Sequence, residues 1–159
     1  MVLVKVLFIC LGNICRSPTA EGVFRKHIKN ENLNHKIKID SVGTGSWHVG
    51  NPPDKRSQEV ATLRGYDISN QRSRQINNRD IEESDYLIAM DTNNISTLQE
   101  LIPEEMKKKL FLFLEFAPQL EQLDVPDPYY SGPDGFDLVI DLIEAASEGL
   151  LAHIKDTDF

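Results

Sequence analysis

The pattern of apolar and polar positions along the chain predicts strands separated by helices. Residues 2–9 form an almost uninterrupted apolar run rich in β-branched side chains, which is typical of a strand buried on both faces of a parallel sheet. Residues 36–42 alternate between polar and apolar side chains, as expected of a second strand at a sheet edge. Shorter apolar runs at residues 86–90 and 109–114 predict further strands.

Between these strands, apolar residues recur at helical spacing. The first predicted helix follows the first strand and a short loop, with Ser17 as its N-cap and Pro18 at its first position. A second covers residues 54–64 and is stopped by Gly65. Strands alternating with helices predict an α/β fold in which helices flank both faces of a parallel sheet. The remaining helices are expected at residues 92–101 and 134–154.

Composition and charge narrow the class of protein. At 159 residues, without an internal repeat or a flexible linker, the chain is expected to form one domain over residues 1–159. The formal net charge of −8 disfavours nucleic acid and anionic membranes as partners, and no apolar run is long enough to span a membrane. The apolar start of the chain lacks the basic flank and cleavage site of a secretory signal. Both cysteines lie in one loop, which suits a reducing compartment and predicts a cytoplasmic location.

The loop after the first strand lies where parallel sheets bind their ligands. Its sequence reads Cys10-Leu11-Gly12-Asn13-Ile14-Cys15-Arg16-Ser17. Backbone N–H groups of a tight turn before a helix converge on one point and form a nest for an anion. Gly12 permits backbone conformations that other residues rarely adopt, and Asn13 tolerates the left-handed one. Arg16 adds a planar fork that binds two phosphate oxygens.

The same loop places a nucleophile at the mouth of its positive field. The thiolate of Cys10 should be stabilised there, with Ser17 donating a hydrogen bond to the sulfur. A phosphoryl group in flight spreads negative charge over its oxygens, which the loop N–H groups and Arg16 would meet. We therefore expect Cys10 to attack phosphorus and form a thiophosphate ester. A cysteine that merely fills a strand end would leave the register of Gly12, Asn13 and Arg16 unexplained.

From Val6 to Glu21 the sequence resembles the low-molecular-weight protein tyrosine phosphatases almost position for position. The resemblance implies that family's four-stranded parallel sheet flanked by helices. It also implies hydrolysis of phosphotyrosine or small aryl phosphates through a phosphocysteine intermediate, with inorganic phosphate as product and no metal ion or other cofactor. The likeness continues, in the family's order, through Asp40-Ser41, Trp47, Val49-Gly50-Asn51-Pro52-Pro53-Asp54, Ser73-Arg74-Gln75, Met90-Asp91 and Asp127-Pro128-Tyr129-Tyr130.

The resemblance also implies roles for matching residues of this chain. Cys10 would be the nucleophile and Arg16 the phosphate ligand, while Asn13 and Ser41 would hold the loop open through hydrogen bonds. Asp127 would protonate the leaving phenol oxygen and then activate water, a task that suits a carboxyl group on a mobile loop. The residues that resemble the family's aromatic pocket walls are Trp47, Tyr129 and Tyr130.

Two of these positions also allow a plainer interpretation, and a third departs from the family's pattern. The segment around Asp127 is rich in turn residues and would by itself predict an ordinary surface turn. Trp47 is also compatible with packing over the sheet edge. Where many members of the family carry a histidine, this chain has Gln71 or Arg72, which puts one polar link to the catalytic loop in question.

Other activities fit the residues less well. Arsenate reduction of the thioredoxin-coupled type passes a disulfide along three cysteines, whereas this chain has two. A phosphoarginine phosphatase would carry Thr in place of Ile14, whose bulk suits an aromatic ring better than a guanidinium. A non-catalytic phosphate-binding module would need neither Cys10 nor Asp127. The histidines are scattered without metal-ligand spacing, so no metal site is expected.

Cys15 lies five residues after Cys10 in the same loop. We predict that an oxidant converts Cys10 to a sulfenic acid, which Cys15 captures as a disulfide. Such a bond would protect the nucleophile from irreversible oxidation and make the enzyme redox-regulated. The alternative is that Cys15 is a small side chain that fills space behind the loop.

Overall fold

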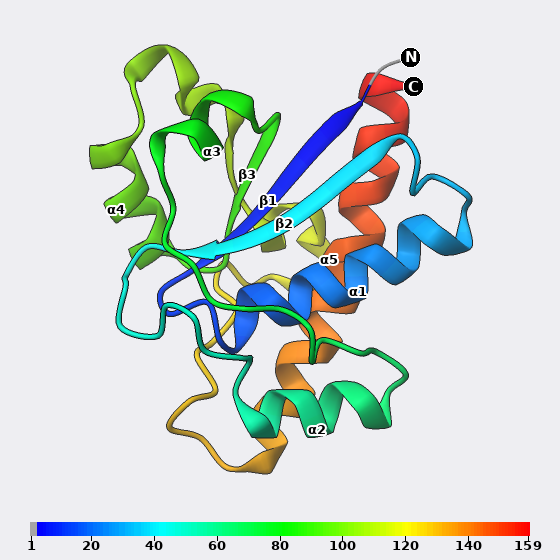
Figure 1. Cartoon of the computed structure of the whole chain (residues 1–159). Coiled ribbons are helices and arrows are strands. Elements are labelled where there is room, and N and C mark those ends of the chain that lie inside the picture. Colours follow the sequence, from blue (N-terminus) through cyan, green and yellow to red (C-terminus); the bar gives the residue numbers. More distant parts are fainter. Residues whose placement is uncertain (1–2) are drawn as a thin grey trace.

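The computed structural model describes residues 3–159, and it confirms the predicted α/β fold. All paired strands run parallel in one sheet of order β2-β1-β3-β4 (Figure 1). β2 is therefore an edge strand, and its alternating pattern leaves Lys38 and Asp40 exposed. The strands are β1 (Val4–Cys10), β2 (Ile37–Gly43), β3 (Tyr86–Ala89) and β4 (Leu110–Leu112).

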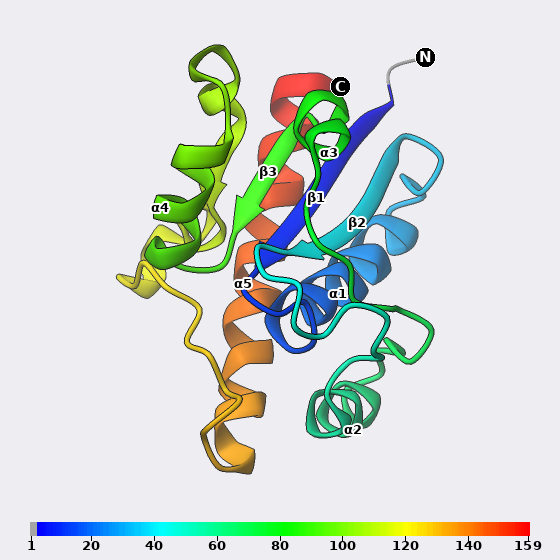
Figure 2. The same cartoon turned by 60° about the vertical axis from the view of Figure 1, so that its left-hand side comes forward.

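Helices cover both faces of the sheet (Figure 2). α1 (Arg16–Asn30) and α5 (Pro133–Asp158) pack on one face, and α3 (Asn78–Glu83) and α4 (Thr92–Leu101) pack on the other. α2 (Lys55–Leu63) lies against the part of α5 that extends beyond the sheet (Figure 1). Short 3-10 helices at Glu104–Lys109, Phe113–Phe116 and Pro118–Leu120 flank β4.

Each face of the sheet has its own hydrophobic core, which explains the continuous apolar run of β1. Val6 and Phe8 belong to the core under α1 and α5, where the ring centroids of Phe8 and Phe24 lie 5.6 Å apart. Leu7 and Ile9 belong to the core under α3 and α4. Because successive side chains of a strand point to opposite faces, only an unbroken apolar run can serve both cores.

The start of α1 differs from the prediction. The helix begins at Arg16, with Cys15 rather than Ser17 at the N-cap, and its first backbone bond runs from Thr19 N to the Cys15 carbonyl (3.3 Å). Pro18 is therefore the third residue of the helix, within its first turn, where its missing N–H would have had no intrahelical partner. Ser17 does not cap the helix because its hydroxyl contacts the Cys10 sulfur instead.

Two other predictions also need correction. The strand predicted at 109–114 ends at Leu112, and the chain continues into a 3-10 helix in which Phe113 and Leu114 are buried. A short apolar run cannot by itself distinguish a buried strand from a buried helical turn. The sequence reading also missed α3, whose six residues begin with a capping box between Asn77 and Asp80.

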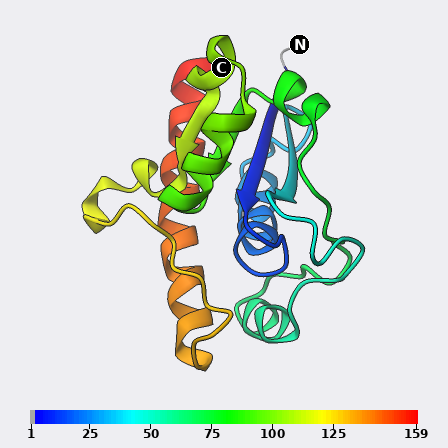
Figure 3. The same ribbon diagram turned by 90° about the vertical axis from the view of Figure 1, so that its left-hand side faces the viewer.

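The remaining helices agree with the pattern, and Gly65 ends α2 in the left-handed conformation (φ 88°). Within residues 3–159, no helix is both long and apolar enough to cross a membrane. The loop after β1 and the segment after β2 lie at the same end of the sheet (Figure 3). The segment that leads into α5 reaches this end too, because the Val125 carbonyl accepts a hydrogen bond from Arg16.

Candidate active site

The loop after β1, residues 11–15, folds around the sulfur of Cys10. The backbone N–H of Asn13 donates to this sulfur at 3.2 Å, and the hydroxyl oxygen of Ser17 lies 3.0 Å from it. Asn13 has the predicted left-handed backbone (φ 55°). Gly12 does not, which corrects the expectation for it. Its missing side chain instead makes room for the His48 ring, since a Cβ there would lie 3.0 Å from His48 Cδ2.

A buried polar network holds this loop from behind. The Asn13 side-chain amide donates to Ser17 Oγ at 2.8 Å and to Ser41 Oγ at 3.0 Å. Its carbonyl oxygen accepts from the backbone N–H of Arg74 at 3.1 Å. Asn13 is therefore held by three partners from three segments, and its left-handed backbone is fixed by contacts that reach β2 and the 71–74 loop.

Gln71 occupies the outer end of the network. Its side-chain oxygen accepts from Ser41 Oγ at 3.3 Å, and its side-chain amide donates to the Pro18 carbonyl at 2.9 Å. The departure from histidine thus leaves a polar link in place. Arg72 instead donates to the carbonyls of Ser69 and Gln71 and stays exposed.

Two glycines let the segment after β2 press against the loop. A Cβ on Gly43 would lie 2.7 Å from the Leu11 carbonyl oxygen, so only glycine permits this approach. Gly45 donates its N–H to the same oxygen at 2.9 Å. The ring of Trp47 fills the space where a Gly45 side chain would be, with atoms as close as 1.8 Å to that position. Trp47 lines the same cavity as Cys10.

Arg16 is a buried cation at the base of the site. Its side chain is 3% exposed, and Nη1 donates to Asp91 Oδ2 at 2.5 Å and to the Val125 carbonyl at 3.0 Å. Nη2 lies 3.7 Å from Asp127 Oδ2. Burial acts to lower the pKa of Arg16, but the Cys10 sulfur and the two carboxylates outweigh it, so the net shift is upward. The guanidinium therefore stays charged, and its Nη1 contacts fix its plane.

Asp91 was named within the resemblance but was given no role in the site. It comes two residues after the end of β3 and caps α4, where its carboxylate accepts from Asn94 N at 2.7 Å. A signal was present, because Asp91 comes at the carboxyl end of the strand next to β1 in the sheet. Its carboxylate both orients Arg16 and caps the N-terminus of α4, and only the second role leaves a local sequence pattern.

Cys10, Arg16 and Asp127 line one cavity of about 280 Å³. Its mouth is open, since the side chains of Trp47 and Tyr130 are 71% and 92% exposed. The bottom of the cavity holds the buried Cys10 thiol and Arg16 cation, and the exposed aromatic rings stand at its mouth. Such a cavity can hold a tetrahedral anion attached to a planar group. The other lining residues are Leu11, Gly12, Ile14, Cys15, Trp47, His48, Tyr129 and Tyr130.

Cys15 differs from Cys10 in its surroundings. It packs with Ile14 and Phe136 in a small apolar cluster. Burial raises the pKa of its thiol to about 12, a shift that the hydrogen bond with Ser57 only partly opposes. Cys15 is therefore a neutral thiol near pH 7, whereas a nucleophile must be a thiolate.

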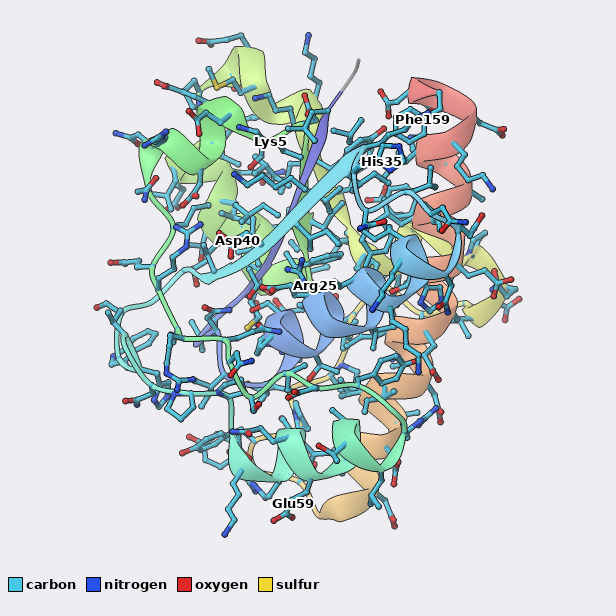
Figure 4. The ribbon with its side chains drawn as sticks, turned by 45° about the vertical axis from the view of Figure 1, so that its right-hand side comes forward. Lys5, Arg25, His35, Asp40, Glu59 and Phe159 are labelled. Atoms are coloured by element: carbon cyan, nitrogen blue, oxygen red, sulfur yellow. The ribbon has the colours of Figure 1, made fainter. Side chains whose placement is uncertain are left out.

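A larger cavity of about 670 Å³ opens between α1, β2 and the 65–72 loop. Arg25 on α1 and Asp40 on β2, both labelled in Figure 4, belong to its walls. Of the polar network behind the Cys10 loop, only Ser41 and Gln71 line this larger cavity. Its lining includes neither cysteine, so the smaller cavity is the better candidate for chemistry.

Together, fold and site define an α/β protein whose first strand–helix loop presents a cysteine and an arginine to an anion. The family described as "Low molecular weight phosphotyrosine protein phosphatase" matches residues 5–158. The low molecular weight protein-tyrosine-phosphatase YfkJ of Bacillus subtilis is 41% identical over 153 residues, which cover 96% of this chain and 97% of YfkJ. The chain belongs to the low molecular weight phosphotyrosine protein phosphatase family.

Solved structures agree with this assignment. A protein tyrosine phosphatase from Entamoeba histolytica, crystallised with Hepes in its active site, is 42% identical, with a TM-score of 0.94 over 98% of this chain and 99% of that one. A Drosophila arginine phosphatase is 32% identical, with a TM-score of 0.89 over 97% of this chain and 99% of that one. The same fold thus occurs in proteins described by different substrates, and the substrate of this chain must be argued from its own pocket.

Proposed function

We propose that this chain hydrolyses phosphotyrosine and small aryl phosphates in two steps through a phosphocysteine. The observation that carries the proposal is the meeting of Cys10, Arg16 and Asp127 around one cavity with aromatic walls. A buried cation alone would explain binding of an anion. A thiol beside it and a carboxyl group at the mouth add a nucleophile and a proton donor, which binding does not need.

In the first step, the Cys10 thiolate attacks phosphorus while the bond from phosphorus to the tyrosine oxygen breaks. Asp127, protonated at this stage, gives its proton to that oxygen, so that a neutral phenol leaves. Arg16 and the loop N–H groups hold the three equatorial oxygens as their charge grows. Ser17 lies at 3.0 Å from the sulfur and would stabilise the thiolate before attack.

In the second step, water attacks phosphorus and the P–S bond breaks. Asp127, now a carboxylate, takes a proton from the water, and Cys10 leaves as a thiolate. Inorganic phosphate is the product. Asp127 Oδ2 lies 3.7 Å from Arg16 Nη2, and a phosphoryl group bound between them would separate the two charges.

Ile14 and the exposed rings support an aromatic substrate over phosphoarginine. Ile14 lines the cavity and is 9% exposed, so a short apolar wall lies beside the position of the leaving group. A guanidinium there would lose water without gaining a partner from that wall. A phenol ring would pack against Ile14 and between Trp47, Tyr129 and Tyr130.

We also propose that Cys15 protects Cys10 by forming a disulfide after oxidation. Peroxide would convert the Cys10 thiolate to a sulfenic acid, and the Cys15 thiol would displace water from it to form the S–S bond. Because the pKa of Cys15 is raised to about 12, the thiolate is scarce near neutral pH. Disulfide formation should therefore accelerate about tenfold for each pH unit between about pH 7 and pH 10.

Mass spectrometry after brief peroxide treatment tests the protective role. We expect a Cys10–Cys15 disulfide in the intact chain and recovery of activity with added thiol, while Cys15→Ser loses activity irreversibly. Absence of the disulfide, or equal recovery in Cys15→Ser, would make Cys15 a space-filling residue.

We further propose that residues 1–159 form one domain and that the protein works in the cytoplasm. Cys10 and Cys15 are free thiols that line the same cavity, and the reducing cytoplasm would keep both as thiols between oxidative events. Oxidation state measured in rapidly quenched cells tests this location, because a chain isolated with the pair permanently oxidised would contradict it.

Phosphate release from a phosphotyrosine peptide, measured with a chelator present, tests the activity. The wild-type chain should turn the peptide over and Cys10→Ser should not, while phosphoarginine should be a poor substrate of both. If folded wild type releases phosphate from phosphoarginine faster than from phosphotyrosine, the argument from Ile14 is wrong. If it turns over neither, the chain is a phosphate-binding module.

A further inference from the structure

Arg56 lies between two aromatic rings at the two ends of the segment that follows Asp127. Its guanidinium carbon is 5.3 Å from the ring centroid of Tyr129 and 4.8 Å from that of Phe136. Tyr129 comes two residues after Asp127, and Phe136 lies in the first turn of α5. A cation over an aromatic face is attracted by the ring quadrupole at these distances. Arg56 therefore joins both ends of residues 129–136 to α2.

Asp54 fixes the position of Arg56. Its carboxylate accepts from Arg56 Nε at 3.1 Å and from Nη2 at 3.0 Å, which is a two-pronged pair. The same carboxylate caps α2 by accepting from Arg56 N at 2.8 Å. The Asp54 side chain is 12% exposed and that of Arg56 is 45% exposed, so the position of the guanidinium rests on the two-pronged geometry and on the two rings rather than on burial.

Asp54 is in turn attached to the phosphate-binding loop. Its backbone N–H donates to the Ile14 carbonyl at 2.7 Å. Phe136, the second ring under Arg56, packs with Ile14 and Cys15. The start of α2 thus contacts the loop around Cys10 through Asp54 and contacts Tyr129 through Arg56.

Tyr129 connects these contacts to the carboxyl group of Asp127. Its backbone N–H donates to Asp127 Oδ1 at 3.0 Å. On the other side of Asp127, Val125 is anchored by hydrogen bonds to Met90 and Arg16. Asp127 therefore lies between a fixed point at Val125 and a second point at Tyr129 that depends on Arg56.

We propose that Arg56 is a positioning residue that holds Asp127 at the correct distance from the phosphate-binding loop. The inference rests on the proposed function, in which Asp127 is the general acid. Arg56 does not line the cavity and touches no reacting atom. It acts through Tyr129, and the Asp54 pair transmits the position of the phosphate-binding loop to the acid.

Leaving-group dependence of kcat/KM, which reports the first step, tests this role. Arg56→Leu should lower kcat/KM about tenfold for a phosphotyrosine peptide and less than about twofold for p-nitrophenyl phosphate, whose leaving group needs little protonation. Arg56→Lys should recover only part of the loss, because an ammonium cannot form the planar pair with Asp54. Lys55→Leu, a change to the neighbouring exposed cation of α2, should have no effect. Inhibition by vanadate, which reports the phosphate-binding loop, should stay unchanged in all three variants.

A double-mutant comparison decides whether Arg56 acts through Asp127. In an Asp127→Ala background, Arg56→Leu should cause no further loss with the peptide. Equal losses for both substrates, or an undiminished loss in the Asp127→Ala background, would reduce Arg56 to a stabilising residue. If Arg56→Leu does not fold, Arg56→Lys supports the same comparison.

The same data separate this inference from the proposed function. If Asp127→Ala alone shows no leaving-group dependence, Asp127 is not the acid and the proposed function fails at that residue. If Asp127→Ala shows the dependence and neither Arg56 variant does, only the role of Arg56 is overturned.

Discussion

The phosphate-binding loop and the segment around Asp127 face the same cavity but are held very differently. Asn13 and Arg16 in the first are each 3% exposed, and both make hydrogen bonds to other segments. Asp127 in the second has a side chain that is 43% exposed, and its carboxylate is held by one backbone N–H and a loose contact with Arg16. The anion site is thus held by several buried contacts, whereas the proposed acid is held by fewer and more exposed ones.

This difference matches what each part must do. Oxygens of a phosphoryl group have the same arrangement in every substrate, so preorganised donors cost nothing at the moment of reaction. The leaving oxygen lies at a position that depends on the bound peptide, and an acid on an exposed segment can follow it. Disrupting the loop should therefore harm both binding and chemistry, while disrupting the acid should harm chemistry alone.

Replacement of Arg16 should produce the largest loss. Arg16→Lys keeps a charge but removes the fork, together with the paired contacts to Asp91 and Val125. We expect kcat/KM for the phosphotyrosine peptide to fall about 10³-fold and inhibition by inorganic phosphate to weaken in parallel. Arg25→Lys, on the far side of α1, is the matched control. Near-normal turnover by folded Arg16→Lys would remove the phosphate-binding role.

Loss of the acid should have the next largest effect. Asp127→Ala should lower kcat/KM about 10²-fold for the peptide and about tenfold or less for p-nitrophenyl phosphate, with unchanged inhibition by vanadate. Asp134→Ala, farther along the same segment, should leave both substrates unaffected. Weaker vanadate binding in Asp127→Ala would contradict the contrast between the two regions.

The left-handed residue tests how much of the loop depends on its support. Asn13→Ala removes three hydrogen bonds, those with the Ser17 hydroxyl, the Ser41 hydroxyl and the backbone N–H of Arg74. It also places an ordinary side chain at φ 55°, which costs about 1–2 kcal/mol. We expect a loss of about 2–4 kcal/mol in unfolding free energy by urea titration and about tenfold in kcat. Asn13→Gly also lacks the three hydrogen bonds but tolerates φ 55° without strain. It should therefore be more stable than Asn13→Ala and less stable than the wild type.

Gln71 should give the smallest effect because it contacts the loop only through Ser41. Gln71→Leu should lower kcat about threefold and leave the ratio between peptide and p-nitrophenyl phosphate unchanged. Asn70→Leu, one residue earlier and exposed, is the control. A change in the ratio would mean that the network behind the loop also governs the acid.

The sequence predicted the phosphate-binding loop far better than the contacts that complete it. Cys10, Asn13 and Arg16 lie within seven residues, so chain connectivity alone brings them together. Asp91 follows β3, which the sheet order places beside β1, and Gln71 comes from a loop that reaches the network through hydrogen bonds with Ser41 and Pro18. The N-cap was assigned to Ser17 by local preference, but the hydroxyl is bound to Cys10 and Asn13. Local rules fail at this residue because the site uses the same atom.

The edges of the fold show the same limit. Burial on both faces made β1 predictable, whereas β4 has three residues and passes straight into a 3-10 helix. Periodicity needs more residues than that to separate the two structures. The short helix α3 has one buried residue, Ile81, so it has almost no apolar pattern to detect.

Trapping the intermediate on Cys10 tests whether hydrolysis proceeds in two steps through a phosphocysteine. Asp127→Ala and wild type would be mixed with a phosphotyrosine peptide, quenched in acid within one turnover and mapped by mass spectrometry. We expect one phosphoryl group on Cys10 in both proteins, accumulating to a higher level in Asp127→Ala because that variant also lacks the base for hydrolysis. Steady release of phosphate with no phosphoryl group on Cys10 at any time, or with the group on another residue, would contradict it.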